Sequence, residues 1–204
     1  MNRAAFLDRD GVINRKAPGD GYITRWEEID FLPGVAQAIA LLNRTGFRVI
    51  VVTNQRCVAK GLVTICELEW IHRRMCEVLA DAGATIDAVY YCPHELEPPC
   101  PCRKPRPGLL LDAAREHGIA LTKSWMIGDS DVDIEAGRNA ECGTALIMRN
   151  GQTTNGSADV AGLSLIEVVQ QILVWEGRSD QKSPKSSCGR RRTVDPSTVI
   201  EGRR

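Results

Sequence analysis

The sequence predicts an α/β fold: a Rossmann-like parallel sheet with helices on both faces. Short apolar runs rich in β-branched residues alternate with segments of helical spacing along most of the chain, which is typical of parallel sheets covered by helices. Polar residues suited to chemistry follow several of these runs directly, at the strand ends where such sheets carry their sites. A content of 43% hydrophobic and 25% charged residues excludes fibrous and wholly disordered proteins.

The expected strands are apolar runs bounded by polar residues or glycine. They cover residues 4–7, 47–52, 86–91, 124–127 and 144–148. The expected helices carry apolar residues three or four apart, and several end at a glycine. They cover residues 34–45, 65–82, 108–117, 132–139 and 163–175. Residues 92–107 are rich in proline and are expected to form a loop.

Charge divides the chain into a body, residues 1–177, and a basic tail, residues 178–204. The tail has 8 Lys and Arg against 3 acidic residues, which leaves 18 basic and 23 acidic residues in the body. We expect one domain in the body and a disordered tail with few apolar residues. The mildly acidic body argues against nucleic-acid binding. No apolar run reaches the ~18 residues of a membrane span, and the acidic start is unlike a secretory signal. These observations indicate a cytoplasmic protein. A monomer is the expected oligomeric state.

Acidic, hydroxyl and basic side chains follow successive strands of the expected sheet. Asp8 and Asp10 come directly after the first strand, where burial of two unpaired charges would be costly. Thr53 follows the second strand, Lys104 follows the proline-rich loop, and Asp129 follows the fourth strand. The Asp pair alone is also typical of a turn rich in Asp and Gly. Together with the other three residues, it favours a functional site.

These motifs resemble, in the same order, those of the haloacid dehalogenase-like phosphohydrolases, and the resemblance extends over residues 4–148. It implies a phosphoric monoester hydrolase in which Asp8 attacks phosphorus and forms an aspartyl-phosphate. Asp10 would act as general acid and base, while Thr53 and Lys104 would hold the transferring oxygens. Mg²⁺ held by Asp8, Asp129 and the backbone carbonyl of Asp10 would neutralise the repulsion between carboxylate and phosphate.

The role of Asp133, four residues after Asp129, is open at this point. Its carboxylate is suited to orienting Lys104 or supporting the metal site. It is equally suited to the start of the helix, where an acid interacts favourably with the helix dipole.

A second cluster, the Cys–His loop of residues 92–102, contains three cysteines and a histidine. Cys92, His94, Cys100 and Cys102 together form a donor set typical of structural zinc, the alternative being a chance gathering of thiols. Because Arg103 and Lys104 follow directly, a zinc ion bound here would also determine where these two cations point.

Within the superfamily, Cys-Pro-His followed by Cys-x-Cys-Arg-Lys-Pro is similar to two groups of enzymes without a large cap domain. One group is the D-glycero-D-manno-heptose 1,7-bisphosphate 7-phosphatases, and the other is the histidinol-phosphate phosphatases. Residues 20–23, 52–55, 90–94 and 102–108 are more similar to the heptose group. This favours removal of the 7-phosphate on the route to a nucleotide-activated heptose of an envelope glycan such as lipopolysaccharide. Histidinol phosphate is the alternative substrate. A non-catalytic zinc-stabilised binding module would need neither Asp8 nor Asp10.

The same resemblance implies that several loop residues contact the phosphorylated small-molecule substrate. These residues are Asp20, Gly21, Tyr22, Asn54, Gln55, Arg56 and Arg103. A guanidinium such as that of Arg103 suits bidentate contact with a second phosphate or a sugar hydroxyl. The sequence departs from the heptose group at Arg56 and Cys57, which replace Ser-Gly, and at Ser130, where Lys is common. Two or three residues are also inserted before Gly21.

Other residues with chemical potential are expected to have structural roles. His72 and His117 are interpreted as surface or helix-cap residues, and the tryptophans Trp70, Trp125 and Trp175 as packing residues. Cys57 lies near the expected site, but Asp8 fits the nucleophile better.

Overall fold

The computed structural model describes residues 2–19, 21–148 and 158–181, and it contains the predicted α/β architecture. The strands are β1 (Arg3–Leu7), β2 (Phe47–Asn54), β3 (Ala88–Cys92), β4 (Trp125–Gly128), β5 (Gly143–Ile147) and β6 (Val160–Gly162). The helices are α1 (Val35–Arg44), α2 (Ile65–Asp81), α3 (Gly108–His117), α4 (Asp131–Asn139) and α5 (Leu165–Gln181). Short 3₁₀ turns occur at Trp26–Glu28 and Leu121–Lys123.

The strands form one parallel sheet in the order β3-β2-β1-β4-β5-β6. The chain moves outward from β1 through β2 to β3, then crosses back to β4 on the other side of β1. Parallel sheets bind ligands at the crevice where the strand order reverses in this way. That crevice lies between the carboxyl ends of β1 and β4.

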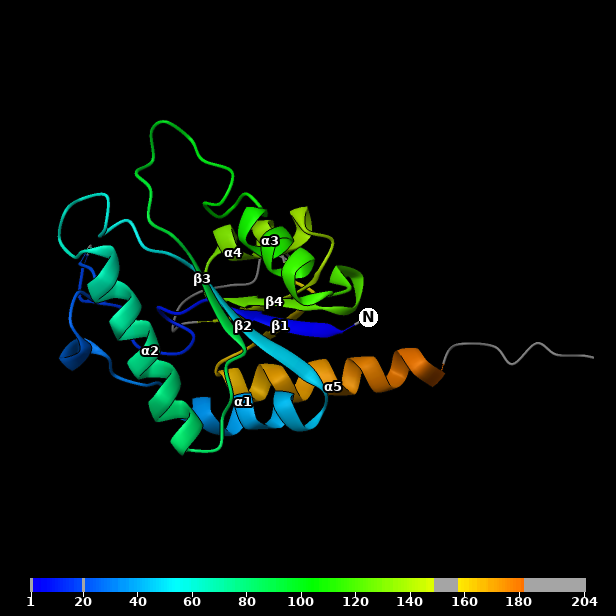
Figure 1. Cartoon of the computed structure of the whole chain (residues 1–204). Coiled ribbons are helices and arrows are strands. Elements are labelled where there is room, and N and C mark those ends of the chain that lie inside the picture. Colours follow the sequence, from blue (N-terminus) through cyan, green and yellow to red (C-terminus); the bar gives the residue numbers. More distant parts are fainter. Residues whose placement is uncertain (1, 20, 149–157, 182–204) are drawn as a thin grey trace, which may run out of the picture.

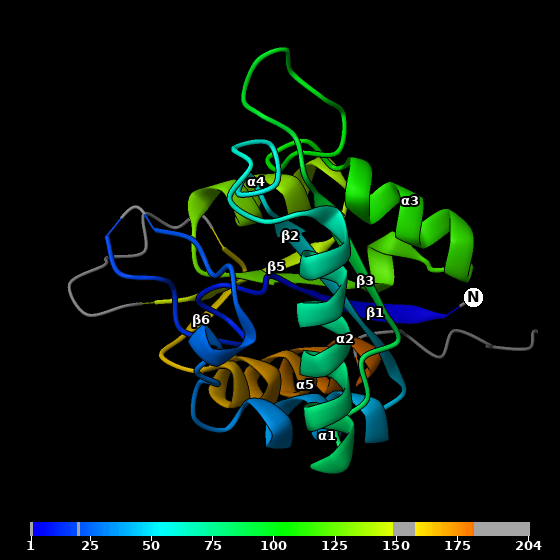
Figure 2. The ribbon, with the colours of Figure 1, turned by 60° about the vertical axis from the view of Figure 1, so that its left-hand side comes forward.

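Helices cover both faces of the sheet, as Figures 1 and 2 show. Helices α1 and α5 lie side by side under one face, where Ile39, Leu42 and Val168 join the core. Helices α3 and α4 cover the other face, where Leu110 and Ala136 pack against strand residues such as Phe6. Burial of β1 from both sides explains its unbroken apolar run.

Helix α2 begins with a capping box between Thr64 and Glu67. Its buried residues include Met75 and Leu79, which belong to the core on the α1 and α5 side, and Leu68, which packs with Cys57 and Val63. The amino-terminal half of α2 therefore lies close to the carboxyl end of β2.

The predicted elements match the structure within a few residues, with two differences at the end of the chain. Strand β6 was not predicted, and α5 ends at Gln181 instead of residue 175, so it includes the first four residues of the expected tail. The rest of that tail lies outside the described residues. Among the residues described, no helix has the length and apolar character required to cross a membrane.

Candidate active site

The carboxyl ends of β1, β2 and β4 bring the predicted catalytic residues together. Asp8 follows β1, Thr53 lies near the end of β2, and Asp129 follows β4. Lys104 reaches the same place from the loop after β3, and its ammonium lies 2.9 Å from a carboxylate oxygen of Asp8. The structure therefore gathers Asp8, Asp10, Thr53, Lys104 and Asp129 at the topological switch point.

Lys104 is a buried cation with three oxygen partners. Its Nζ lies 2.6 Å from Asp133 Oδ1 and 2.9 Å from Asp8 Oδ1, and it donates to the Val52 carbonyl at 2.8 Å. Burial alone would lower the pKa of Lys104, but the charges of Asp133 and Asp8 raise it above its ordinary value. Lys104 therefore remains charged beside Asp8.

Asp133 forms an ion pair with Lys104, in agreement with one of the interpretations left open by the sequence. It also lies in the first turn of α4 and beside Asp8 and Asp129, so the helix-start and metal-site interpretations remain compatible with its position. Its other carboxylate oxygen accepts a 2.5 Å hydrogen bond from Ser130 Oγ. Gly128 makes this position possible, because a Cβ there would lie 2.1 Å from Asp133 Cβ. The glycine before Asp129 thus allows α4 to bring Asp133 against the end of β4.

Asp8 combines burial with an accessible edge. Its side chain is 14% exposed, and Oδ1 accepts a hydrogen bond from the Arg9 backbone N–H at 2.8 Å. Burial raises the pKa of Asp8 to about 6, although the charge of Lys104 opposes the shift. A partly exposed carboxylate beside a fixed cation can approach an anionic phosphate.

Asp10 has both carboxylate oxygens engaged. Oδ1 accepts from Arg9 Nε at 3.1 Å and Asn14 Nδ2 at 2.9 Å, and Oδ2 accepts from Arg9 Nη2 at 2.8 Å and Gln55 Nε2 at 2.9 Å. Burial would raise the pKa of Asp10, but the charge and hydrogen bonds of Arg9, with those of Asn14 and Gln55, lower it below its ordinary value. The turn continues through Gly11, whose φ of 100° favours glycine.

The acidic residues at the switch point fit a hard divalent cation. Carboxylate oxygens of Asp8, Asp129 and Asp133 lie within 4.8 Å of one another, and Mg²⁺ prefers such oxygen ligands. Lys16 Nζ lies 2.9 Å from Asp129 Oδ1, so a cationic group already lies beside this carboxylate. Lys16 was not expected at the site, because no sequence pattern links the loop after β1 to the end of β4.

The residues expected to contact substrate have different positions. Arg103 and Asn54 line a cavity of about 460 Å³ beside Lys104. Asn54 also exchanges two 3.1 Å hydrogen bonds with the Lys104 backbone. Gly21 and Tyr22 line a separate cavity of about 450 Å³ that also includes Lys16. Asp20 lies outside the described residues.

Gln55 and Arg56, which the resemblance also assigned to substrate contact, do not line either of these two cavities. Gln55 is 1% exposed, and its amide donates to Thr53 Oγ1 at 2.9 Å as well as to Asp10. Its side chain therefore connects Thr53 to Asp10 inside the protein. Arg56 forms an ion pair with Glu95, which joins the loop after β2 to the Cys–His loop.

The four predicted zinc ligands meet in the Cys–His loop. The sulfur of Cys92 lies 3.5 Å from that of Cys100, and Cys102 Sγ lies 3.4 Å from Cys100 Sγ and 3.2 Å from His94 Nδ1. Zn–S bonds of about 2.3 Å place two sulfurs of a tetrahedron roughly 3.8 Å apart. The spacing exceeds a disulfide bond and approaches that of a tetrahedral metal site.

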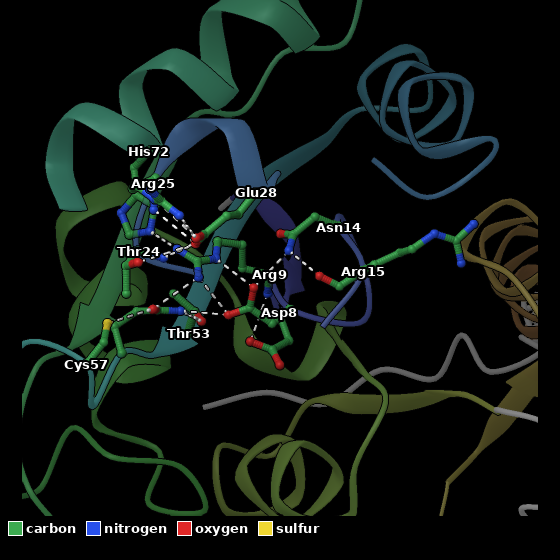
Figure 3. Close-up of polar contacts among 12 residues, drawn as sticks. Asp8, Arg9, Asn14, Arg15, Thr24, Arg25, Glu28, Thr53, Cys57 and His72 are labelled. Atoms are coloured by element: carbon green, nitrogen blue, oxygen red, sulfur yellow. Dashed lines mark hydrogen bonds and ion pairs between the residues drawn. The ribbon is translucent and has the colours of Figure 1, made fainter. Parts of the chain in front are cut away.

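His72 was interpreted as a surface residue, and that interpretation is wrong. It is 4% exposed, and its Nε2 lies 3.0 Å from Nη1 of Arg9, which is fully buried (Figure 3). Arg9 was also absent from the predicted site. Arg9 lies at a bend between Asp8 and Asp10, and no sequence pattern indicates that its side chain turns inward to contact Asp10. Trp125 is buried as expected, whereas Trp70 and Trp175 are about half exposed.

Fold and site together define a haloacid dehalogenase-like hydrolase. The carboxylates after β1 and β4, the hydroxyl of β2 and the lysine after β3 occupy the places that the sequence motifs implied. A family model described as HAD-hydrolase-like matches residues 101–167.

Relatives of the chain show to which family of haloacid dehalogenase-like hydrolases it belongs. A D-glycero-beta-D-manno-heptose-1,7-bisphosphate 7-phosphatase of Photorhabdus laumondii is 38% identical over 83% of this chain and 92% of its own. A D-glycero-alpha-D-manno-heptose-1,7-bisphosphate 7-phosphatase of Mycobacterium bovis is 40% identical over 79% of this chain and 87% of its own. The chain therefore belongs to the heptose bisphosphate phosphatase family and is a phosphatase.

A solved structure supports this assignment. The D,D-heptose 1,7-bisphosphate phosphatase of B. bronchiseptica, crystallised with magnesium and phosphate, superposes with a TM-score of 0.76. It is 35% identical and covers 85% of this chain and 99% of its own.

Proposed function

We propose that the chain hydrolyses the 7-phosphate of D-glycero-D-manno-heptose 1,7-bisphosphate through a phosphorylated Asp8. The observation that carries the proposal is the contact of Asp8 with the fixed ammonium of Lys104, a residue that also lines the cavity containing Arg103, next to the hydrogen-bonded Asp10. The names of the relatives support the choice of sugar. The reaction belongs to the route toward an activated heptose.

The chain's own residues supply nucleophile, proton transfer and charge stabilisation. Asp8 attacks phosphorus while Lys104 and the Thr53 hydroxyl stabilise the charge on the transferring oxygens. Asp10 accepts four hydrogen bonds and is therefore ionised in this structure, the form that takes a proton from attacking water. To protonate the leaving oxygen it must exchange one of these hydrogen bonds for its own O–H.

We assign Mg²⁺ to Asp8, Asp129 and the Asp10 backbone carbonyl. Bound there, it would supply positive charge that offsets the repulsion between Asp8 and the substrate phosphate. Lys104 and Asp133 are hydrogen-bonded to each other, so the charge of the lysine is partly neutralised by this carboxylate.

We assign structural zinc to Cys92, His94, Cys100 and Cys102. Their donor atoms lie within 4.8 Å of one another, and three thiolates with one imidazole are a common ligand set for zinc. Arg103 donates to the His94 carbonyl at 3.4 Å, so the Cys–His loop also positions the residue we assign to the substrate's second phosphate.

We also propose that residues 1–177 form the catalytic domain, which works as a cytoplasmic monomer. Helix α5 completes the core under the sheet, because Val168, Val169 and Ile172 are fully buried. Removal of residues after Gln181 should therefore leave turnover unchanged.

A phosphate-release assay tests the proposed function. The substrates are both anomers of the heptose bisphosphate, heptose 1-phosphate, histidinol phosphate and common hexose phosphates. We expect turnover of a bisphosphate anomer at least about tenfold above the others, which corresponds to one useful contact of roughly 1.4 kcal/mol. Asp8→Asn should be inactive while retaining its fold. Faster turnover of histidinol phosphate would replace the proposed substrate, and an active Asp8→Asn variant would exclude the covalent mechanism.

A further inference from the structure

Arg9 is a charged side chain with no exposed surface. Burial of a guanidinium is costly unless hydrogen bonds satisfy its N–H groups. Its Nε and Nη2 donate to the two oxygens of Asp10, forming a bidentate pair. Nη2 also donates to Gln55 Oε1 at 3.1 Å. These contacts fix the guanidinium plane on one side, toward the catalytic carboxylate.

His72 of α2 supplies the contact on the other side. Its Nε2 lies 3.0 Å from Arg9 Nη1, as Figure 3 shows. An arginine has only donors, so Nε2 must be the acceptor and the imidazole is neutral, with its proton on Nδ1. Burial, together with the charge of Arg9, lowers the pKa of His72 to about 3. The neutral form therefore persists across the range in which enzymes work.

The imidazole is itself held by its surroundings. Its ring packs against Tyr91, with ring centroids 5.6 Å apart, and the Tyr91 hydroxyl donates to Glu69 Oε1 at 2.8 Å. Helix α2 thus presents a fixed acceptor to the buried arginine. A chain of hydrogen bonds therefore links His72 on α2 to Arg9, and Arg9 to the Asp10 carboxylate.

We propose that His72 is a positioning residue that acts through Arg9 to orient the Asp10 carboxylate for proton transfer. The inference rests on the proposed function, in which Asp10 is the proton-transfer group. Without the acceptor, Arg9 Nη1 would be a buried donor without its partner, which is unfavourable. The guanidinium would then shift toward another acceptor, and the bidentate contact with Asp10 would change.

Two substrates separate this role from a general structural one. A sugar phosphate has a poor leaving group that needs a proton, whereas p-nitrophenyl phosphate releases a stable phenolate without one. The value of kcat/KM reports the steps through departure of the leaving group. We expect His72→Leu to lower kcat/KM for the sugar phosphate by about 10- to 100-fold, since a misplacement of ~1 Å can cost on the order of 10²-fold. The loss with p-nitrophenyl phosphate should be less than about threefold, because leaving-group protonation is not required.

Two further variants complete the kinetic test. His72→Gln retains an acceptor near the position of Nε2 and should recover most of the sugar-phosphate activity. Met75→Leu lies on the same helix, is equally buried and conserves volume, so it controls for a general disturbance of α2. Equal losses on both substrates in His72→Leu, or no recovery in His72→Gln, would overturn the proposal.

Crystal structures of the two His72 variants test the inference independently of turnover. The Asp10 carboxylate should rotate away from its Arg9 contacts in His72→Leu and keep them in His72→Gln. An unchanged Asp10 in His72→Leu would overturn the positioning role even if the enzyme is active. If the wild-type protein releases no phosphate from any monoester, the proposed function fails, and the structures still decide whether His72 holds Arg9 and Asp10.

Discussion

Lys104 shows how a single buried charge can be kept in place for catalysis. Its three oxygen partners come from the segment after β1, from β2 and from α4, and together they fix the position of the ammonium from three sides. The neighbouring Arg103 is only partly buried and lines the adjacent cavity. This difference in burial suits Lys104 to the transferring phosphoryl group and Arg103 to substrate recognition.

Arg103→Ala should therefore weaken a bisphosphate substrate more than a simple monophosphate. We expect kcat/KM for the heptose bisphosphate to fall by about 10- to 100-fold, since hydrogen bonds to charged groups contribute roughly 1.5–3 kcal/mol. The value for p-nitrophenyl phosphate should change little, because Lys104 is intact. Arg106→Ala removes another cavity arginine and serves as the matched control. Equal losses of Arg103→Ala on both substrates would contradict the division of roles.

The ion pair between Lys16 and Asp129 should affect how tightly the site binds Mg²⁺. The Lys16 ammonium pairs with Asp129 but is about half exposed, so the pair is worth at most about 1 kcal/mol. A metal ion that binds Asp129 must compete with this pair. Lys16→Met should tighten Mg²⁺ binding by about two- to fivefold in a calorimetric titration. Lys123→Met makes the same charge change at an exposed residue outside the site and should leave Mg²⁺ affinity unchanged. Weaker binding in Lys16→Met would show that Lys16 supports the metal site.

The Cys–His loop is the element in which local structure depends most on a bound ion. Its backbone has no helix or strand between Cys92 and Gly108, and only its three cysteines pack against the core on the α3 and α4 side of the sheet. The body of the sheet, in contrast, is held by buried apolar residues on both faces. Metal loss should thus affect activity more than overall stability.

Purified protein should contain about one zinc ion per chain, separate from exchangeable Mg²⁺. Cys100→Ser should release the zinc and lower kcat/KM on the order of 10²-fold, because Arg103 and Lys104 would lose their positions. The midpoint of unfolding should decrease only modestly. Elemental analysis with thermal unfolding checks both expectations, and Cys66→Ser, an exposed thiol elsewhere, is the control. Full activity in a zinc-free variant would contradict the positioning role of the loop.

The helices and central strands were predictable because each buries an apolar face with a clear period. The strand β6 was missed because three residues, Val160–Gly162, are too few to show a period. The prediction of α5 ended too early because it followed the last large apolar residue, whereas Glu, Arg and Gln continue a helix readily. The hydrophobic pattern of the sequence therefore predicted which elements exist more reliably than where each of them ends.

At the scale of the whole molecule, topology assembles a site that no local pattern contains. The order of the strands places β1 beside β4, although more than a hundred residues separate Asp8 from Asp129. Motif order predicted the chemistry of these residues through resemblance. It could not predict that α2 would bring His72 to Arg9 or that Lys16 would reach Asp129, because both contacts depend on tertiary packing.

The buried His72 also links the stability of the whole molecule to pH. In the folded state its pKa is about 3, because burial and the charge of Arg9 outweigh the opposing charge of Asp10. In the unfolded chain it is about 6.5. Between these values the unfolded state binds the additional proton, so unfolding becomes more favourable as pH falls.

We therefore expect protonation of His72 in the unfolded state to remove about 1.4 kcal/mol of unfolding free energy between pH 7.5 and pH 5.5. Urea unfolding of the wild type and of His72→Gln at both values isolates this contribution, because the variant lacks the titrating ring. Shifted carboxylates such as Asp8 and Asp10 contribute similarly to both proteins and largely cancel in the difference. On acidification, the unfolding free energy of the wild type should therefore fall more than that of His72→Gln. An equal pH dependence of the two proteins would mean that His72 is not held neutral in the fold, and the hydrogen bond from Arg9 to its ring would then have to be rejected as well.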